Sequence, residues 1–396
     1  MLLTYWHINT KEKTTLARLR NAKVVFFSGE VEVMISWQLG IMQTCDNFAT
    51  MPFRLGQLAQ VVAYTPFLSG SKVRLVLSNL YGEADLCFDE IYLSKEEKFH
   101  VKHQVTYLKQ KQVVIRRGHK LQTDPLTLKV QAGEKLYVWM KASRKQTYAD
   151  VASTYATDLI NASYGQKFDY CPSLRVNEHQ RKSWFSLEGI LVWTKHKPKV
   201  VEFAGDSLME MGFVSQALGK LFLEEYPQQV TYLNTAVSGS RLLYDCPTDS
   251  PLLATYGQSL LKRKPKPSSV ALSICFCGGN DLLLPAYSSQ ASKQVVTPAT
   301  LVAGFRKLLT SWPNPVVSST ILPAKKIQAQ SEATRLVVNQ ELSSWSQIFD
   351  GAKLLVDGQG KLKPTYQLGD GLHINQAGGN LLAQQLLAFL KTNSLL

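Results

Sequence analysis

The sequence predicts two consecutive domains, an all-β, jelly-roll-like sandwich over residues 1–195 and a three-layer α/β/α domain over residues 199–396. Residues 24–195 alternate apolar and polar side chains in short segments, which is the period of half-buried strands. After the basic linker at residues 194–199, apolar β-branched runs alternate with segments of helix length. This second pattern indicates a flavodoxin-like, five-stranded parallel sheet that helices cover on both faces.

The first domain contains strand candidates separated by Gly, Asn and Asp turns, at residues 72–80, 104–108, 111–118, 124–130 and 134–143. Residues 148–182 interrupt this rhythm with a weak pattern. We interpret them as a long irregular excursion of the kind that can cover a site.

The second domain contains five apolar runs that we expect to be strands, at residues 199–205, 229–237, 268–276, 315–323 and 352–357. Segments of helix length lie between or after these runs, at residues 208–226, 297–312, 331–349 and 375–392. Strict alternation of this kind places all the strands in one parallel sheet.

The composition is that of a globular protein with enough apolar residues to bury a core: 396 residues, 45% hydrophobic and 19% charged. The net charge of +14 raises the question of an anionic partner. However, the basic residues are scattered, and the densest runs, at residues 195–199 and 262–266, lie in expected loops. No nucleic-acid-binding motif accompanies them, so we expect a solvated basic face and no nucleic-acid partner, with an acidic polymer as the alternative.

The N-terminal segment lacks the apolar core of a signal peptide, since polar and charged residues break it early. Residues 24–42 carry Glu30 and Glu32 and alternate, which favours strands over a membrane span. We therefore expect a cytoplasmic protein. The six cysteines have no regular spacing, and Cys275 and Cys277 lie on an apolar run, so buried thiols are favoured over a metal site, and no cofactor is expected.

Four polar segments follow expected strands or precede the last helix, at residues 205–208, 234–239, 278–281 and 370–373. In open α/β sheets the ligand lies at the carboxyl ends of the strands. We therefore expect these four segments to meet at that edge.

The residue types in these segments suit nucleophilic catalysis. A serine hydroxyl such as that of Ser207 needs an imidazole base, and His373 is the only histidine after His196. Asp370, three positions before it, can fix the tautomer of the ring. The backbone amides of Ser207 and Gly239 and the side-chain amide of Asn280 are candidate oxyanion donors.

Each residue also has a plainer interpretation. Asp206, Ser207 or Asn280 can cap a helix, Gly239 can be a turn residue and His373 a surface residue. We expect Asp206 and Asp281 to brace turns and cap helices in any case. The coincidence of all these residues at strand ends favours the catalytic interpretation.

The four segments resemble the blocks of the SGNH, or GDSL, hydrolase superfamily. AGDSLMEMG (204–212) resembles the first block, NTAVSGSRLL (234–243) the second, GGND (278–281) the third and DGLHINQAGG (370–379) the last. The TILP strand end at 320–323, with Arg335 and Asn339, is similar to the helix-and-strand context found in the carbohydrate-esterase-like members of this superfamily. Upstream, residues 70–86 and 122–128 resemble a β-sandwich that precedes the hydrolase domain in one bacterial branch.

The resemblance implies a serine esterase with Ser207 as nucleophile, His373 as base and Asp370 as orienting acid, and with the oxyanion donors named above. The expected substrate is a short acyl ester, above all an acetyl ester, of a carbohydrate or other small molecule. A lipase or thioesterase of the same superfamily and an inactive carbohydrate-binding protein are the alternatives. Met209, Ser240 and Ile374 depart from the common family pattern without removing a catalytic group. Oligomerisation stays open.

Overall fold

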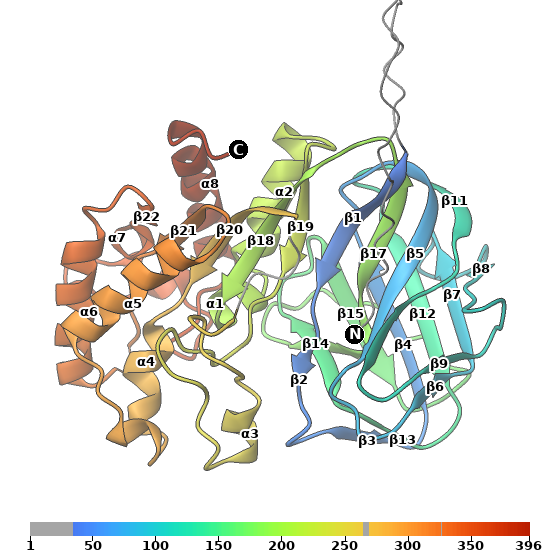
Figure 1. Cartoon of the computed structure of the whole chain (residues 1–396), viewed down its shortest axis with the longest axis horizontal. Coiled ribbons are helices and arrows are strands. Elements are labelled where there is room, and N and C mark those ends of the chain that lie inside the picture. Colours follow the sequence, from blue (N-terminus) through green and yellow to red (C-terminus); the bar gives the residue numbers. More distant parts are fainter. Residues whose placement is uncertain (1–34, 264–268, 326) are drawn as a thin grey trace, which may run out of the picture. The chain divides into compact units, whose positions relative to one another are not determined.

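We analysed a computed structural model of the chain, which describes residues 35–263, 269–325 and 327–396. The predictions that concern residues 1–34 lie outside these ranges. The described chain begins with strands only, continues into alternating strands and helices, and ends in a long helix (Figure 1).

The strands up to residue 194 form antiparallel sheets. The first contains β1 (Ser36–Gln43), β5 (Gly70–Asn79), β10 (His119–Gln122), β11 (Leu126–Val130) and β17 (Leu187–Thr194). The second contains β4 (Leu58–Tyr64), β7 (Glu90–Ser94), β8 (His103–Gln104), β12 (Leu136–Ala142) and β15 (Ile160–Gly165). Smaller sheets pair β2 (Asp46–Asn47), β14 (Asp150–Thr154) and β16 (Lys182–Phe185), β3 (Phe53–Leu55) with β13 (Gln146–Tyr148), and β6 (Leu86–Phe88) with β9 (Val113–Ile115).

The two larger sheets contribute to one hydrophobic core. In β5, Val73 and Leu75 are buried in it, whereas the intervening Arg74 is partly exposed, as strand periodicity requires. Val62 of β4 and Val138 of β12 enter the same core from the second sheet. A jelly-roll-like connection of these strands stays a prediction.

The expected irregular excursion at residues 148–182 is wrong in its first half. Residues 150–154 form β14 and residues 160–165 form β15, and both are largely buried. Their pattern was hard to recognise because β14 is buried at every position, so no polar residue alternates along it. Residues 155–159 connect these two strands, and residues 166–181 form the longer run without a strand.

The C-terminal half contains a parallel sheet of the order β19 (Val230–Asn234), β18 (Lys199–Gly205), β20 (Val270–Phe276), β21 (Val316–Ser319) and β22 (Ile348–Phe349). This is the flavodoxin-type order. The expected strand at residues 352–357 is wrong, because residues 351–355 form helix α7 (Gly351–Leu355). Ala352 and Leu355, one turn apart, are both buried on the core side of this helix.

Helices cover both faces of the parallel sheet (Figure 1). On one face α2 (Ser215–Glu225), α7 and α8 (Gln376–Thr392) share a core with β18 and β20. On the other face α5 (Pro298–Ser311) and α6 (Ala329–Leu342) form a second core. Short helices precede these or fill connections: α1 (Ser207–Glu210), α3 (Pro251–Ala254), α4 (Gly279–Leu283), and the 3₁₀ turns η1 (Leu284–Ala286), η2 (Ala291–Lys293) and η3 (Pro364–Tyr366).

The sheet does not end at the linker between the two predicted domains. Strand β1 pairs in parallel with β19 through Met42 and Gln43, so the first antiparallel sheet and the parallel sheet form one continuous ten-stranded sheet. The main core is also continuous across this junction, where Phe67 stacks on Tyr232 with ring centroids 6.1 Å apart. The N-terminal strands therefore pack directly on the α/β half.

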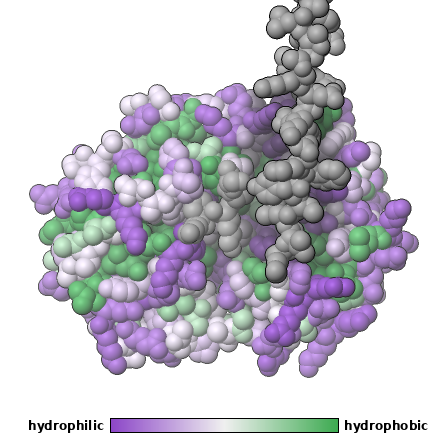
Figure 2. Space-filling model, viewed as in Figure 1, coloured by the Kyte–Doolittle hydropathy of each residue, from purple (hydrophilic) through white to green (hydrophobic). Residues whose placement is uncertain are grey.

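The surface is mixed. Figure 2 shows hydrophilic residues over much of one face, with apolar residues exposed between them. In the described part of the chain, no helix has the length and apolar content that a membrane crossing requires. Cys275 and Cys277 are buried on and just after β20, as expected.

Candidate active site

Ser207 lies in the turn between β18 and α1, and Gly205 shapes this turn. Gly205 has a φ of +117°, and a Cβ added to it would lie 1.9 Å from the carbonyl oxygen of Phe276 in β20. Only glycine permits that approach. The side chain of Asp206 then caps α1 by accepting a hydrogen bond of 3.0 Å from the Leu208 amide, so Ser207 starts the helix.

Ser207, His373 and Asp370 form one hydrogen-bonded chain. The Oγ of Ser207 lies 2.8 Å from Nε2 of His373, and Nδ1 of that ring lies 2.6 Å from Oδ2 of Asp370. The sequence order places Ser207 and His373 166 positions apart, yet the fold brings them together at the carboxyl edge of the parallel sheet. The arrangement joins a hydroxyl, an imidazole and a carboxylate in line.

Backbone amides of its own turn hold the Asp370 carboxylate in place. Its Oδ1 accepts hydrogen bonds from the amides of Leu372 (2.9 Å) and His373 (2.8 Å). Partial burial acts to raise the pKa of Asp370, but the bonds from the His373 ring and from these amides outweigh it and hold the pKa well below its usual range. Asp370 is therefore an anion that can orient the ring and stabilise its protonated form.

The expected donor residues lie on the walls of one cavity. Ser207, Gly239 and Asn280 line one cavity together with His373. The Ser207 amide is the first of α1, where backbone N–H groups have no partner inside the helix. Gly239 has a φ of +76°, and the Nδ2 of Asn280 donates a 3.0 Å hydrogen bond to the carbonyl of Ser240. That bond fixes the Asn280 side-chain amide beside the loop that follows β19.

The two further acids brace loops, as expected. Asp281 accepts hydrogen bonds from the amides of Leu242 (2.7 Å) and Leu243 (3.0 Å), which ties α4 to the loop after Gly239. Burial raises the pKa of Asp281 to about 6 against the effect of these two bonds. Burial also raises the pKa of the capping Asp206 to about 7.

Glu210 is a buried residue of the site that the sequence analysis missed. Its carboxylate accepts hydrogen bonds from the amide of Ser238 at 2.9 Å and from the Ser238 hydroxyl. It also accepts from Ser153 of β14 and, at 3.3 Å, from Arg181. Glu210 follows Ser207 by three positions on α1, and this one-turn spacing was the signal available in the sequence.

The N-terminal strands contribute directly to this site. The Met211 carbonyl accepts the amides of Tyr155 (2.9 Å) and Ala156 (3.0 Å), so the connection between β14 and β15 is pinned to the turn after α1. Tyr155 and Arg181 line the cavity beside Ser207. Residues from the expected excursion thus do border the site.

Arg263 corrects the expectation that the basic run at residues 262–266 is a solvated loop. Its guanidinium donates to the carbonyls of Gly205 (3.1 Å) and Thr235 (3.1 Å) and to the Ser240 hydroxyl (2.6 Å). Arg263 therefore joins the turn after β18 to the loop after β19. Lys262 fits the expectation, since it is exposed and pairs with Asp245 at 2.7 Å.

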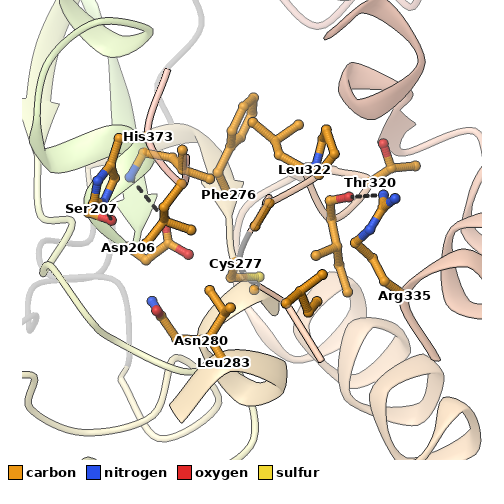
Figure 3. A pocket seen from close by; sticks show the side chains of 17 residues that line it. Asp206, Ser207, Phe276, Cys277, Asn280, Leu283, Thr320, Leu322, Arg335 and His373 are labelled. Carbon is orange, nitrogen blue, oxygen red and sulfur yellow. Dashed lines mark hydrogen bonds between the residues drawn. The ribbon is translucent and has the colours of Figure 1, made fainter. Parts of the chain in front are cut away.

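The end of β21 is also fixed. The Oδ1 of Asn339 accepts a hydrogen bond of 2.8 Å from the Ile321 amide, and its Nδ2 donates one of 2.8 Å to the Ile321 carbonyl. Arg335 donates to the same carbonyl at 3.1 Å. Figure 3 shows Arg335 opposite Ser207 and His373 across the pocket, with Phe276, Cys277 and Leu322 between them. This clamp holds one wall of a hollow next to Ser207.

Two cavities of different size adjoin Ser207. The first, drawn in Figure 3, has a volume of about 30 Å³ and apolar walls that include Phe276, Ile321 and Leu322. The second has a volume of about 540 Å³ and is lined by Tyr155, Arg181, Tyr256 and Tyr287 among others. The hydroxyl therefore stands between a narrow hollow and a wide one.

The departures from the common family pattern lie in packed positions. Met209 and Ile374 are buried in the main core, and the Met209 carbonyl accepts from Ser215 and Asn234. The Ser240 hydroxyl accepts from Arg263. Each departure has a structural role of its own.

No family model matches the sequence, and no curated protein matches it. Solved structures do match. A GDSL-like lipase from Bacteroides thetaiotaomicron is 17% identical over 49% of this chain and 89% of that chain, with a TM-score of 0.35. An acetylxylan esterase from Geobacillus stearothermophilus is 17% identical over 49% and 95%, with a TM-score of 0.36. A family two carbohydrate esterase from Cellvibrio japonicus is 11% identical over 91% and 98%, with a TM-score of 0.35.

The motifs at residues 204–212, 234–243, 278–281 and 370–379 resemble those of the SGNH superfamily.

Proposed function

We propose that the chain is a serine ester hydrolase of the SGNH type that removes short acyl groups, above all acetyl, from a carbohydrate. The observation that carries the proposal is the hydrogen-bonded line from Ser207 Oγ to His373 Nε2 (2.8 Å) and from His373 Nδ1 to Asp370 (2.6 Å). The carboxyl edge of an open parallel sheet is where such folds bind their ligands.

In the first step Ser207 attacks the ester carbonyl while His373 takes the hydroxyl proton at Nε2. Because Asp370 accepts from Nδ1, the neutral ring presents a free lone pair to Ser207, and the carboxylate stabilises the ring once it is protonated. The carbonyl oxygen becomes an oxyanion bound by the amides of Ser207 and Gly239 and by Asn280.

His373 then returns the proton to the alcohol oxygen as the bond from carbon to that oxygen breaks, which leaves the acyl group on Ser207. A water molecule next gives its proton to His373 and attacks the acyl carbon. Collapse of the second oxyanion returns the proton to Ser207 and releases the carboxylic acid. Each proton thus passes through the same imidazole nitrogen.

The size of the narrow hollow beside Ser207 favours a substrate with a short acyl group. Its volume of about 30 Å³ holds about two or three water-sized groups, since roughly 10–15 Å³ is needed for each. An acetyl methyl fits there, whereas a long chain does not. The hydrogen bonds of Arg335 and Asn339 to Ile321 keep this wall in place.

The size and lining of the wide cavity favour an ester whose alcohol part is bulky. Tyr155, Tyr256 and Tyr287 border it, and their rings offer flat apolar surfaces with a hydroxyl at the edge. A sugar ring presents both apolar faces and hydroxyls, so it matches such a lining. The connection between β14 and β15, which supplies Tyr155, would help to shape this side.

The test is hydrolysis of p-nitrophenyl acetate, butyrate and octanoate and release of acetate from acetylated xylo-oligosaccharides, each compared with Ser207→Ala. We expect acetate to be the best acyl group and Ser207→Ala to lower kcat/KM by about 10⁴- to 10⁶-fold. Ser292→Ala, an exposed serine of η2, is the matched control and should retain activity.

Other outcomes would replace the proposal. Serine-dependent turnover that rises toward octanoate would move the assignment to a lipase-like enzyme. Equal turnover by the parent and by Ser207→Ala would mean that Ser207 is not the nucleophile.

A further inference from the structure

A second large cavity lies apart from the catalytic residues. It has a volume of about 610 Å³ and runs between β18 and the segment after β19 on one side and the segments at 44–47 and 80–81 on the other. Ser207, Gly239, Asn280, Asp370 and His373 do not line it. Its volume falls in the range of roughly 300–1,000 Å³ that is typical of small-molecule sites.

Three buried polar atoms on the walls of this cavity have no hydrogen-bond partner within the described ranges. They are Oδ1 of Asp46, Nε of Arg263 and Nε1 of Trp312. Asp46 is 6% exposed and Trp312 is 9% exposed. Buried polar atoms are almost always paired, so three such atoms around one cavity point to a partner that occupies it.

The cationic side chains on the walls of this cavity have acidic neighbours. Two of them pair with acids outside the lining, Lys120 with Glu188 at 2.6 Å and Lys262 with Asp245 at 2.7 Å. The guanidinium of Arg263 interacts with two acids on the same walls, Asp46 and Glu202. A charged ligand would meet a like charge here, which favours a neutral one.

The unpaired atoms define what the ligand must offer. Arg263 Nε and Trp312 Nε1 are donors, so they need an acceptor, whereas the Asp46 carboxyl oxygen needs a donor. A hydroxyl group both donates and accepts. The rings of Tyr81 and Trp312 on the same walls add flat apolar surfaces.

We propose that this cavity is a binding site for a neutral polyhydroxylated ligand, a free mono- or disaccharide. Its hydroxyls donate to Asp46 and accept from Arg263 and Trp312, and its apolar faces pack on Tyr81 and Trp312. The site does not depend on the ester hydrolase function. Because Arg263 also bonds the Gly205 carbonyl behind Ser207, the two sites share one residue.

The experiment is isothermal titration of the full chain carrying Ser207→Ala, so that no ester chemistry contributes. The probes are glucose, xylose, N-acetylglucosamine, cellobiose and xylobiose, with inorganic phosphate as the charged comparison. We expect at least one sugar to bind. Leu80→Trp, which adds bulk to the cavity wall after β5, should weaken that binding by about tenfold or more.

Three further variants keep the test decisive. Trp312→Phe retains an aromatic ring but removes the N–H donor, so it should weaken binding even where Leu80→Trp fails to fold. Leu336→Ala, an exposed residue of α6 outside both cavities, is the matched control and should leave the affinity unchanged. Tyr256→Ala, in the wide cavity beside Ser207, distinguishes sugar bound there from sugar bound in this second cavity. Thermal unfolding of each variant verifies that it is folded.

Three results would overturn the proposal. None of the five sugars binds, which leaves the cavity to water. Binding is lost in Tyr256→Ala but kept in Leu80→Trp and Trp312→Phe, which places the sugar at the wide cavity. Phosphate binds more tightly than any sugar and depends on Leu80, which contradicts a neutral ligand.

Discussion

Gly239, in the loop after β19, is tightly constrained by its surroundings. Its φ of +76° is in the left-handed region, and a Cβ added to it would lie 2.1 Å from a ring carbon of Tyr256. The Tyr256 ring therefore rests directly on the backbone of Gly239. Both residues line the cavity that holds Ser207.

We expect Gly239→Ala to lower kcat by about 10²- to 10³-fold, because the loop must move away from Tyr256 and its amide no longer meets the oxyanion. The measurement is steady-state kinetics on p-nitrophenyl acetate. Gly257→Ala is the matched control, since Gly257 also has a positive φ (+73°) but a Cβ there meets no atom within 4 Å. A Gly239→Ala enzyme as active as Gly257→Ala would remove the Gly239 amide from the mechanism.

The residues of this site were predictable where a strand end carries a distinctive side chain. The sequence order places Ser207, Asn280 and His373 after or near recognisable runs, and the structure brings them together as predicted. Glu210, Arg181 and Arg263 were not predictable in the same way. Their positions depend on packing between distant segments, such as the pairing of Arg181 with Glu210 across 29 positions.

Helix α1 and strand β14 are joined at the element scale by the buried Glu210. Its carboxylate ties the Ser238 amide (2.9 Å) to Arg181 (3.3 Å) and to the hydroxyl of Ser153. The residue after Ser238 is Gly239. The N-terminal strands therefore support the loop that carries an expected oxyanion donor.

Glu210→Gln should lower kcat by about 10- to 100-fold with little change in KM. The amide nitrogen of Gln cannot accept from Ser238, and bonds to a charged group are worth about 1.5–3 kcal/mol each. The measurement separates kcat from KM with an acetyl ester. Glu224→Gln, an exposed acid on α2, controls for loss of charge. A rise in KM alone would mean that Glu210 acts on substrate binding and not on the loop.

The elements show why part of the fold was predictable. The parallel strands and long helices have strong periodic signals, and β18 and α8 lie where the sequence places them. The run at 352–357 was assigned to a strand because a short apolar run has no period of its own. The helix forms there because Ala352 and Leu355 pack in the core beside α8. The pairing of β1 with β19 is non-local and has no sequence signal.

Acids buried beside the sheet affect the stability of the whole molecule. Burial raises the pKa of Asp281 from 3.8 to about 6 and that of Asp206 to about 7. Between about pH 4 and these values the folded chain holds protons that the unfolded chain has released. The contribution of each group to the free energy of unfolding therefore decreases as the pH rises through this window and is constant above it.

Asp281→Asn tests this dependence, because asparagine does not titrate and Asp281 is fully buried. Its Oδ1 can still accept one of the two amides, so the variant should fold with reduced stability at every pH. We expect the stability advantage of the parent over the variant to be smaller at pH 8 than at pH 4, by on the order of 3 kcal/mol. Urea unfolding at pH 4 to 8 measures it.

Asp357→Asn is the matched control for this pH series. The amides of Lys361 and Gln359 lower the pKa of the half-buried Asp357, so its contribution is present above its unfolded pKa of 3.8 and is lost only at lower pH. Its difference from the parent should be nearly constant from pH 4 to 8. If Asp281→Asn gives an equally constant difference, Asp281 is ionised in the folded chain throughout. The two amides of Leu242 and Leu243 would then outweigh the cost of burying its charge.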